Sequence, residues 1–312
     1  MRKFLNILLI LLIMAIIVVG CFFAYKHFTK GDDGQTPEVI SSEPLFTLEN
    51  YPTVDASLAT QPLTNAFIKN FTGVDVDVNT LDYTNTHPGY VRLINDEVDL
   101  IVVTEPSEDE LALAKEKGVE LEVIPVVKEG FVFYVNEKNP IESLTLEQIR
   151  KIYAGEITNW SKVGGNNEEI RAFQRNVNSG SQTGMISLVM KDQKLMEPLK
   201  ENRIESMQEI INIVSDYDNG VNSIGYSYYY YATTMYDDID AEVADRIKLI
   251  GVNGVKPSYE TIKNGSYPIQ TAYYIVINKN EPKDSNVRKL VDAMLSSRGQ
   301  AVAKEAGYVP VK

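Results

Sequence analysis

The sequence predicts an α/β fold with open, mostly parallel sheets, and three observations support this class. Short apolar runs typical of strands alternate with amphipathic segments typical of helices along most of the chain. Serine, threonine, glycine and proline stand where helix caps and turns are needed. The 312 residues are 44% hydrophobic, which is enough for one large or two ordinary globular domains.

The alternation begins with a strand and a helix. Residues 51–57 (YPTVDAS) are typical of a strand, and residues 60–71 predict a helix with Pro62 in its first turn. Residues 74–78 (VDVDV) alternate as a strand does, and residues 99–103 (DLIVV) predict a buried strand.

A capped helix and further strands follow. Residues 107–118 (SEDELALAKEKG) predict a helix with a capping box at its start and glycine at its end. Residues 121–127 and 130–136 predict two strands. The later elements are a helix over 145–155, a strand over 268–278 and a helix over 285–297.

The N-terminus carries an apolar run, residues 4–25, that is long enough to span a bilayer as a helix. Within it, VVGC (18–21) resembles a bacterial lipobox, and cleavage before Cys21 would leave a lipid-anchored protein. The apolar residues after Cys21 favour an uncleaved anchor instead. Residues 1–25 are thus predicted as a transmembrane anchor or a lipoprotein signal, and residues 26–48 as a polar tether. Both alternatives place the remaining chain at the outer face of a membrane.

Charge and the scarcity of certain residues exclude several function classes. The net charge of −13 argues against nucleic acid as a partner, and any anion site must be built from local donors. Cys21 is the only cysteine, and His87 is the only histidine beyond residue 27. A metal site of cysteines or histidines is therefore not expected, and a Ser-His-Asp triad is disfavoured. No glycine-rich nucleotide motif is present, so the sequence predicts no cofactor and no metal.

Residues 174–185 (QRNVNSGSQTGM) combine an arginine with small polar residues directly before an apolar segment. Small residues, hydroxyls and a helix start present donors to an anion, and Arg175 would add a permanently charged fork. A capped loop with Ser179 or Ser181 at the helix start is the structural alternative.

Six segments then occur in a fixed order along the chain. They are YPTVDASLATQPL (51–63), IRKIYAGEITNWSKVGG (149–165), FQRNVNSGSQTGM (173–185), NSIGYSYYYYA (222–232), GVNGVKPSYETIKNGSYPIQTAYYIVIN (251–278) and GQAVAKEAGYVPV (299–311). Together they resemble the phosphate-binding proteins of ABC importers, which have the type II periplasmic-binding-protein fold. The resemblance runs from about residue 50 to residue 312.

The resemblance implies two lobes that close on an oxyanion, joined by a hinge of crossover strands. Lobe one is expected over 49–136 plus 268–312, and lobe two over 137–267. The cleft would lie at the carboxyl ends of the strands. The implied function is capture of phosphate, or a related inorganic oxyanion, outside the cell and delivery to an ABC permease, with no bond chemistry.

The resemblance also implies site residues. In the second lobe the family pattern of Arg, three residues and Ser-Gly-Thr stands here as Arg175, then Ser179-Gly180-Ser181. In the first lobe the small-residue turn stands as Ser57-Leu58-Ala59, whose hydroxyl and backbone N–H groups would donate. Leu58 takes a hydroxyl position, and a helix start capped by Thr60 is the structural alternative.

Two further positions depart from the family. Where the phosphate binders have an aspartate before a proline, this chain has Thr104-Glu105-Pro106. Either Thr104 takes that place, and discrimination against sulfate is lost, or Glu105 swings in and restores the acceptor. Thr86 and His87 take the place of a serine-rich loop, and a protonated His87 would add charge to the anion site.

Two other functions stay open at this point. The departures at Leu58 and Thr104 and an uncleaved anchor favour a membrane-anchored ligand sensor or adhesion module on the same fold. A secreted hydrolase using Ser179 or Ser57 is disfavoured, since the chain beyond residue 27 has one histidine and the sequence has no GxSxG motif. The protein is therefore predicted not to be an enzyme. The aromatic segment 226–236 is interpreted as strand and core positions.

Overall fold

The computed structural model describes residues 43–77, 80–216, 220–235 and 245–312. The described residues form one compact unit. The predicted anchor and Cys21 therefore lie outside the described residues. Among the helices that the structure describes, none is both long and apolar enough to cross a membrane.

Most described strands belong to a single sheet. Within the described residues it contains nine strands, in the order β1-β2-β10-β3-β8-β5, with β11 and β9 paired to β3 and β4 paired to β9. A separate pair is formed by β6 and β7. The bounds are β1 (Val54–Ala56), β2 (Leu100–Val103), β3 (Leu121–Asn136), β4 (Ser143–Leu144), β5 (Arg171–Ala172), β6 (Gln174–Arg175), β7 (Arg203–Ile204), β8 (Ser223–Tyr228), β9 (Ile247–Val252), β10 (Gln270–Asn278) and β11 (Val309–Pro310).

The predicted α/β class is confirmed, but the strand pairing is mixed rather than mostly parallel. Parallel pairs join β1 to β2, β4 to β9, β5 to β8 and β6 to β7. The long strands β3 and β10 pair antiparallel with their neighbours. The prediction was wrong here because the alternation of strands and helices does not reveal strands that return across the sheet.

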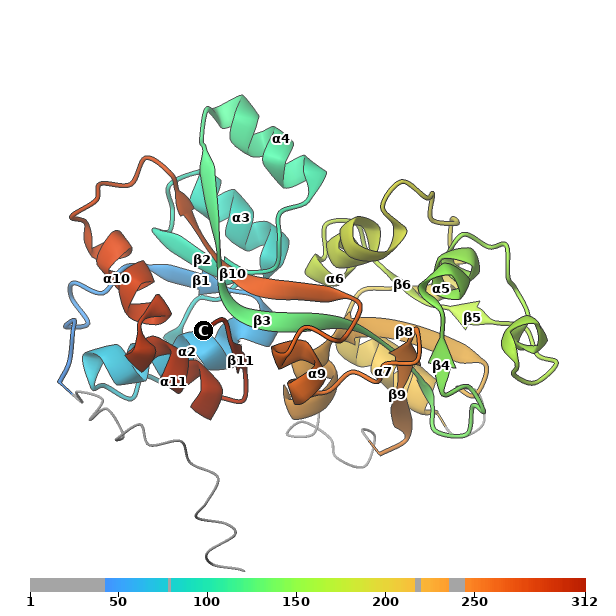
Figure 1. Cartoon of the computed structure of the whole chain (residues 1–312). Coiled ribbons are helices and arrows are strands. Elements are labelled where there is room, and N and C mark those ends of the chain that lie inside the picture. The colour runs from blue at the N-terminus through green and yellow to red at the C-terminus, as the bar shows by residue number, and fades with distance from the viewer. Residues whose placement is uncertain (1–42, 78–79, 217–219, 236–244) are drawn as a thin grey trace, which may run out of the picture. The chain divides into compact units, whose positions relative to one another are not determined.

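Strand β3 connects two lobes. Its residues 121–130 pair with β10, and its residues 131–136 pair with β8 and β9. Figure 1 shows β3 and β10 running side by side between two groups of helices. We call the elements packed around β1, β2 and β10 the first lobe, and those around β8, β9 and β5 the second lobe. The residue limits predicted for the lobes stay a prediction.

The two strands predicted over 121–127 and 130–136 are one continuous strand. The register between β3 and β10 shifts where Tyr273 faces Val127 and Tyr274 faces Pro125, so Val126 is the extra residue of a bulge. Pro125 has no N–H to give to the ladder, which explains why the irregularity lies beside it. The bulge places Tyr273 beside the crossover from one lobe to the other.

Helices cover both lobes, and their ends follow the cap residues in the sequence. Ser107 and Thr145 form capping boxes with Glu110 and Gln148, and Gly118 ends its helix at a φ of 70°. The α-helices are α2 (Gln61–Thr72), α3 (Thr86–Ile94), α4 (Glu108–Lys117), α5 (Leu146–Tyr153), α6 (Gly180–Gly184), α7 (Met207–Ser215), α9 (Tyr259–Lys263), α10 (Asn286–Leu295) and α11 (Ser297–Glu305). Shorter 3₁₀ or π turns are η1 (Leu58–Thr60), η3 (Trp160–Val163), η4 (Met185–Met190), η5 (Lys200–Asn202) and η6 (Tyr231–Met235).

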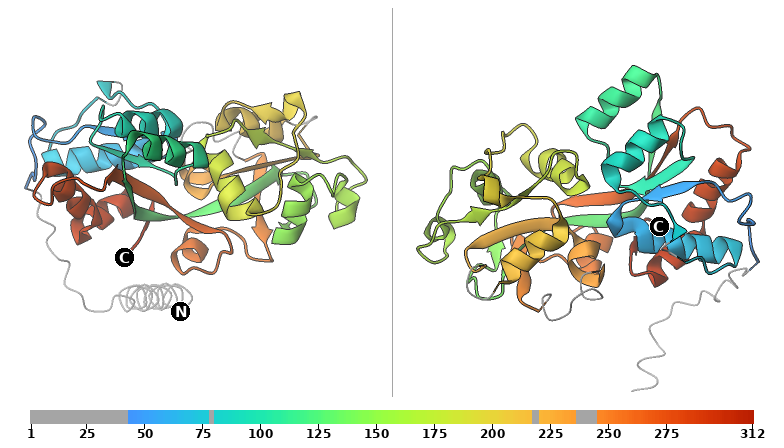
Figure 2. Two further views of the ribbon diagram at one scale, coloured as in Figure 1. Left: turned by 90° about the horizontal axis from the view of Figure 1, so that it is seen from above. Right: turned by 180° about the vertical axis from the view of Figure 1, so that it is seen from behind.

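The C-terminal segment packs against the start of the fold. Helix α11 lies beside α2, as both views of Figure 2 show. The Tyr308 hydroxyl donates to the Ala59 carbonyl at 2.7 Å. The C-terminal segment therefore supports the loop that contains Ser57 and Leu58.

Two predictions near the N-terminus were wrong. Residues 74–77 are not a strand: Val74 is 40% exposed, and β1, the end strand of the sheet, pairs only with β2. An alternating pattern forms a strand only where a neighbour completes the ladder. Residues 43–48 were assigned to the tether, yet Phe46 is buried and its N–H donates to the Phe71 carbonyl at 3.1 Å.

Candidate functional site

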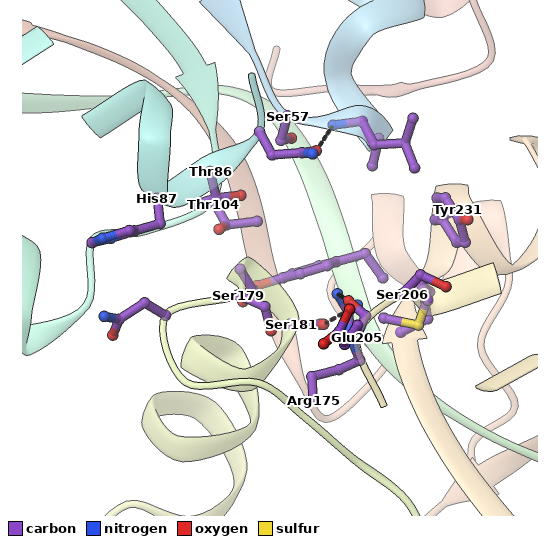
Figure 3. Close-up of a pocket in the computed structure, with 18 of the residues that line it drawn as sticks. Ser57, Thr86, His87, Thr104, Arg175, Ser179, Ser181, Glu205, Ser206 and Tyr231 are labelled. Carbon is purple, nitrogen blue, oxygen red and sulfur yellow. Dashed lines mark hydrogen bonds between the residues drawn. The ribbon is translucent and has the colours of Figure 1, made fainter. Parts of the chain in front are cut away.

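A cavity of about 310 Å³ lies between the two lobes. It brings together all ten residues that the sequence predicted as ligand contacts, namely Ser57, Leu58, Ala59, Thr86, His87, Thr104, Arg175, Ser179, Gly180 and Ser181. Figure 3 shows the labelled first-lobe residues facing Arg175, Ser179 and Ser181 across this space. Segments about 120 residues apart in the chain therefore meet at one place.

Arg175 lies at the end of the short strand β6, where its backbone and side chain are both held. Its backbone N–H donates to Gln182 Oε1 at 2.9 Å and to the Tyr226 hydroxyl at 3.0 Å. Its guanidinium donates to the carbonyls of Ile204 (3.2 Å) and Glu205 (2.7 Å). These bonds fix the direction of the guanidinium at the cavity wall.

Arg175 forms no ion pair with a carboxylate in the described part of the chain. Its remaining hydrogen bond goes to the neutral Ser181 Oγ at 3.3 Å, and no described carboxylate forms an ion pair with it. Burial lowers the pKa of the guanidinium, and nearby tyrosines and the Glu209 carboxylate only partly offset this effect. A half-buried cation held only by neutral oxygens is costly unless an anion joins it.

Ser179 and Ser181 surround the start of α6. The Ser179 side chain accepts from the Gln182 N–H at 3.2 Å and so caps the helix. The capped-loop alternative and the anion-loop interpretation are therefore compatible, because the cap oxygen keeps its own proton for another acceptor. Ser181 is buried and lies against Arg175.

In the first lobe, Ser57 is tied to Thr60. The Thr60 hydroxyl has one proton, which it donates to the backbone carbonyl of either Val102 or Ser57. The 2.9 Å contact between the Ser57 and Thr60 hydroxyls therefore has Ser57 as donor. Ser57 presents lone pairs to the cavity, so in this geometry it is an acceptor rather than the predicted donor.

Leu58 also departs from its predicted role. Its backbone N–H donates to Asn85 Oδ1 at 3.1 Å and is not aimed at the cavity. Asn85 has a φ of 100°, and its side chain bonds to Leu58 and does not cap α3. Asn85 itself lines the cavity and was missed, although asparagine directly before a helix start is a recognisable signal.

Thr104 lines the cavity, whereas its neighbour Glu105 does not. Thr104 is buried, and its hydroxyl has no hydrogen bond of good geometry among the described residues; the nearby Tyr228 hydroxyl donates to the Gly180 carbonyl at 3.0 Å. Glu105 does not line the cavity, and its carboxylate accepts from the Ser187 hydroxyl. In this geometry Thr104, and not Glu105, faces the site. Burial raises the pKa of Glu105.

Thr86 and His87 begin α3 at the cavity wall. Thr86 is buried, whereas the imidazole of His87 is 42% exposed and its Nδ1 lies 2.9 Å from Glu110 Oε1. Because this ring nitrogen faces a carboxylate of α4, the predicted contribution of His87 to an anion is reduced. No group of three His, Cys, Asp or Glu side chains in the described ranges is arranged to hold a metal ion.

Gly180 packs closely against Thr104 and Thr86 of the first lobe. A Cβ at this position would lie 2.5 Å from Thr104 Oγ1 and 2.9 Å from Thr86 Oγ1. We expect Gly180→Ala to push the lobes apart and to weaken ligand binding by about tenfold, because overpacking of this kind costs about 1–3 kcal/mol. Isothermal titration calorimetry of the variant measures this loss.

Gly89→Ala is the matched control for that prediction. Gly89 lies in α3 near the site, but its added Cβ would meet only ordinary contacts at 3.7 Å or more. Binding within about twofold of the parent is expected for this variant. Equal losses in both variants would contradict the assignment of Gly180 as an interlobe contact.

The aromatic segment contributes more to the site than the sequence suggested. Tyr226, Tyr228 and Tyr231 are buried, as predicted, but Tyr228 and Tyr231 also line the cavity. Ser206 lines it too, at the start of α7, where the sequence Ser-Met-Gln-Glu is a helix-start signal. Trp160 packs as predicted, with its indole N–H donating to the Asn222 carbonyl at 2.9 Å.

Two lobes joined by crossover strands, with a cleft between them that contains Arg175 and several hydroxyls, define a solute-binding protein of the periplasmic-binding class. The family model described as a PBP superfamily domain matches residues 53–298, and the chain belongs to this superfamily. Membership of this superfamily supports a substrate-binding protein rather than an enzyme. It also supports a location outside the cytoplasm.

Two curated proteins and one solved structure illustrate what this chain is similar to. Protein SphX of Synechococcus elongatus is 25% identical over 273 residues, which are 83% of this chain and 77% of that protein. Phosphate-binding protein PstS of Bacillus subtilis is 23% identical over 322 residues, covering 98% of this chain and 94% of that protein. The crystal structure of an ABC-type phosphate transport receptor from Vibrio cholerae matches with a TM-score of 0.60 at 18% identity, covering 82% of this chain and 98% of that one. This structural match confirms the two-lobe fold.

Proposed function

We propose that this protein captures phosphate, or a related inorganic oxyanion, between its two lobes and delivers it to an ABC permease. The single observation that carries the proposal is Arg175, a half-buried guanidinium that has no carboxylate partner among the described residues. An oxyanion supplies the missing charge and accepts several hydrogen bonds at once.

The surrounding groups fit a small oxyanion. Hydroxyls of Ser179, Ser181, Thr86 and Thr104 lie around the same cavity. Neutral donors and one guanidinium can hold an anion in a protein whose overall charge is negative, because the site acts over hydrogen-bond distances. The relatives named as phosphate-binding proteins support this choice of ligand.

Ser57 favours phosphate over sulfate. Hydrogen phosphate carries a proton near neutral pH, and sulfate does not. Because Ser57 gives its own proton to Thr60, its lone pairs are available to accept the proton of the ligand. Thr104, whose buried hydroxyl lies beside that of Tyr228, is a second group able to accept or donate.

The place of the protein in the cell follows from the N-terminal run. We propose that residues 1–25 hold the chain at the outer face of the membrane, either as an uncleaved helix or through lipid on Cys21. Both forms keep the binding unit near a permease. The support for this step is the apolar sequence alone.

Thermal unfolding with different anions tests the function. We expect phosphate at ~1,000 times its dissociation constant to stabilise the protein by about 4 kcal/mol. Sulfate, molybdate and tungstate at the same concentration are expected to give smaller shifts. Equal shifts with all four anions would remove the phosphate assignment, and no shift with any of them would favour a sensor or adhesion module with another ligand.

A further inference from the structure

Two hydrogen bonds cross the cleft outside the anion site. The Ser187 hydroxyl of η4 donates to the Glu105 carboxylate, which follows β2 in the first lobe. The Asn178 side-chain amide donates to Asp109 Oδ2 of α4 at 2.9 Å. Both carboxylates belong to the first lobe, and both donors belong to the second lobe.

These bonds flank the contact of Gly180 with Thr104 and Thr86. Asn178 lies two residues before Gly180 in the chain, and Ser187 lies seven residues after it. Segment 178–187 therefore meets the first lobe at three successive points. The same segment contains Ser179 and Ser181, which line the cavity. A movement that breaks these bonds also moves the groups that face the anion.

We propose that the pairs Glu105–Ser187 and Asp109–Asn178 form a latch that holds the two lobes closed and slows release of the bound anion. The inference rests on the proposed function, because the released ligand is the oxyanion of that site. Each pair joins a carboxylate to a neutral donor, so the latch adds no cation that would compete with Arg175 for the anion.

The latch affects release of the anion more than its capture. Ser187 and Asp109 are exposed and Glu105 and Asn178 are half-buried, so each bond contributes modestly and breaks readily. Such contacts form as the lobes close, whether or not an anion is bound, and the anion enters while the lobes are open. Their loss therefore raises the dissociation rate and leaves the association rate nearly unchanged.

Energy transfer within the full-length protein measures closure directly. Trp160 in the second lobe is the only tryptophan, and Lys115 is an exposed residue of α4 in the first lobe. With Cys21→Ser and Lys115→Cys in the background, a thiol-reactive acceptor dye labels position 115 alone. We expect Glu105→Ala, Ser187→Ala and Asp109→Ala to lower the transfer from Trp160, without any added anion.

Stopped-flow release of phosphate gives the second readout. Each latch variant is expected to raise the phosphate dissociation rate by about 2- to 10-fold. The double variant Glu105→Ala/Ser187→Ala should be little worse than either single variant, because both remove the same bond. Glu108→Ala, in the exposed first turn of α4, is the matched control and should match the parent in both readouts.

The outcomes separate the latch from the proposed function. Unchanged transfer and unchanged release in all three variants would overturn the latch, as would effects no larger than those of Glu108→Ala. If the parent does not bind phosphate, the proposed function fails, and the transfer measurement alone then supports or overturns the latch.

Discussion

Replacing Arg175 with alanine is expected to weaken phosphate binding by at least about 30-fold. Loss of one partner of a buried, hydrogen-bonded charge pair costs about 2–5 kcal/mol, and each 1.4 kcal/mol is about tenfold in affinity. Arg175 is the only guanidinium that lines the cavity among the described residues, so no neighbour replaces its charge. Isothermal titration calorimetry with phosphate measures the loss.

Arg175 also supports the local structure, which the experiment must separate from binding. Its side chain donates to the Ile204 and Glu205 carbonyls, so the alanine variant loses contacts between β6 and the start of α7. Arg175→Lys keeps a positive charge but not the planar fork, and we expect intermediate binding for it. Unfolding curves without anion report whether either variant has lost stability.

Arg203→Ala is the matched control for the arginine variants. Arg203 lies on β7 beside the strand that carries Arg175, but its partner is the exposed Glu197 at 2.5 Å, outside the cavity. Its loss should leave phosphate affinity within about twofold, since exposed ion pairs contribute little. An Arg175→Ala variant that binds as tightly as Arg203→Ala would contradict the anion site.

The parts of the fold that depend on local signals were predictable from sequence. The caps at Ser107 and Thr145 and the glycine at position 118 stand at the helix ends that the structure shows. The clustering of small polar residues after Arg175 also predicted one wall of the cavity. In each case the residues that give the sequence signal also make the contacts, and they lie within a few positions of one another in the chain.

The parts that depend on distant contacts were not predictable in the same way. The donor direction of Ser57 depends on Val102, and the amide of Leu58 is taken by Asn85. No pattern within 51–63 contains that information. Glu105 likewise could not be placed from its own surroundings in sequence, because its partner Ser187 lies on the other lobe. Tertiary contacts decide these roles, and local propensity does not.

Raising the pH from about 5 to about 8 is expected to destabilise the protein, because the buried Glu129 carboxyl then loses its proton. Glu129 is 2% exposed on β3, beside the crossover from the first lobe to the second. Burial raises the pKa of this carboxyl to about 8, although N–H groups of Gly130, Tyr230 and Tyr229 partly oppose the rise. No described Lys or Arg forms an ion pair with it.

The sign of the effect follows from proton binding. The pKa of Glu129 in the folded protein lies above the ordinary value of 4.5, so the folded state holds a proton that the unfolded state has released between these two pH values. The free energy of unfolding therefore falls as pH rises across this window and levels off above pH 8. The change amounts to about 1.4 kcal/mol for each unit of pKa difference, a few kcal/mol in total.

Comparison of Glu129→Gln with the parent isolates this effect from other titrating groups. The glutamine side chain is neutral at every pH, so urea unfolding from pH 5 to pH 9 should give a flatter profile, with the variant more stable than the parent above pH 8. Glu137→Gln, an exposed position one residue beyond the same strand, should keep the slope of the parent. Parallel profiles for Glu129→Gln and the parent would show that Glu129 is ionised in the folded protein across this range.

In that case the carboxylate must obtain its stabilisation from the backbone N–H groups of Gly130 and Tyr230, and the crossover would tolerate a buried charge.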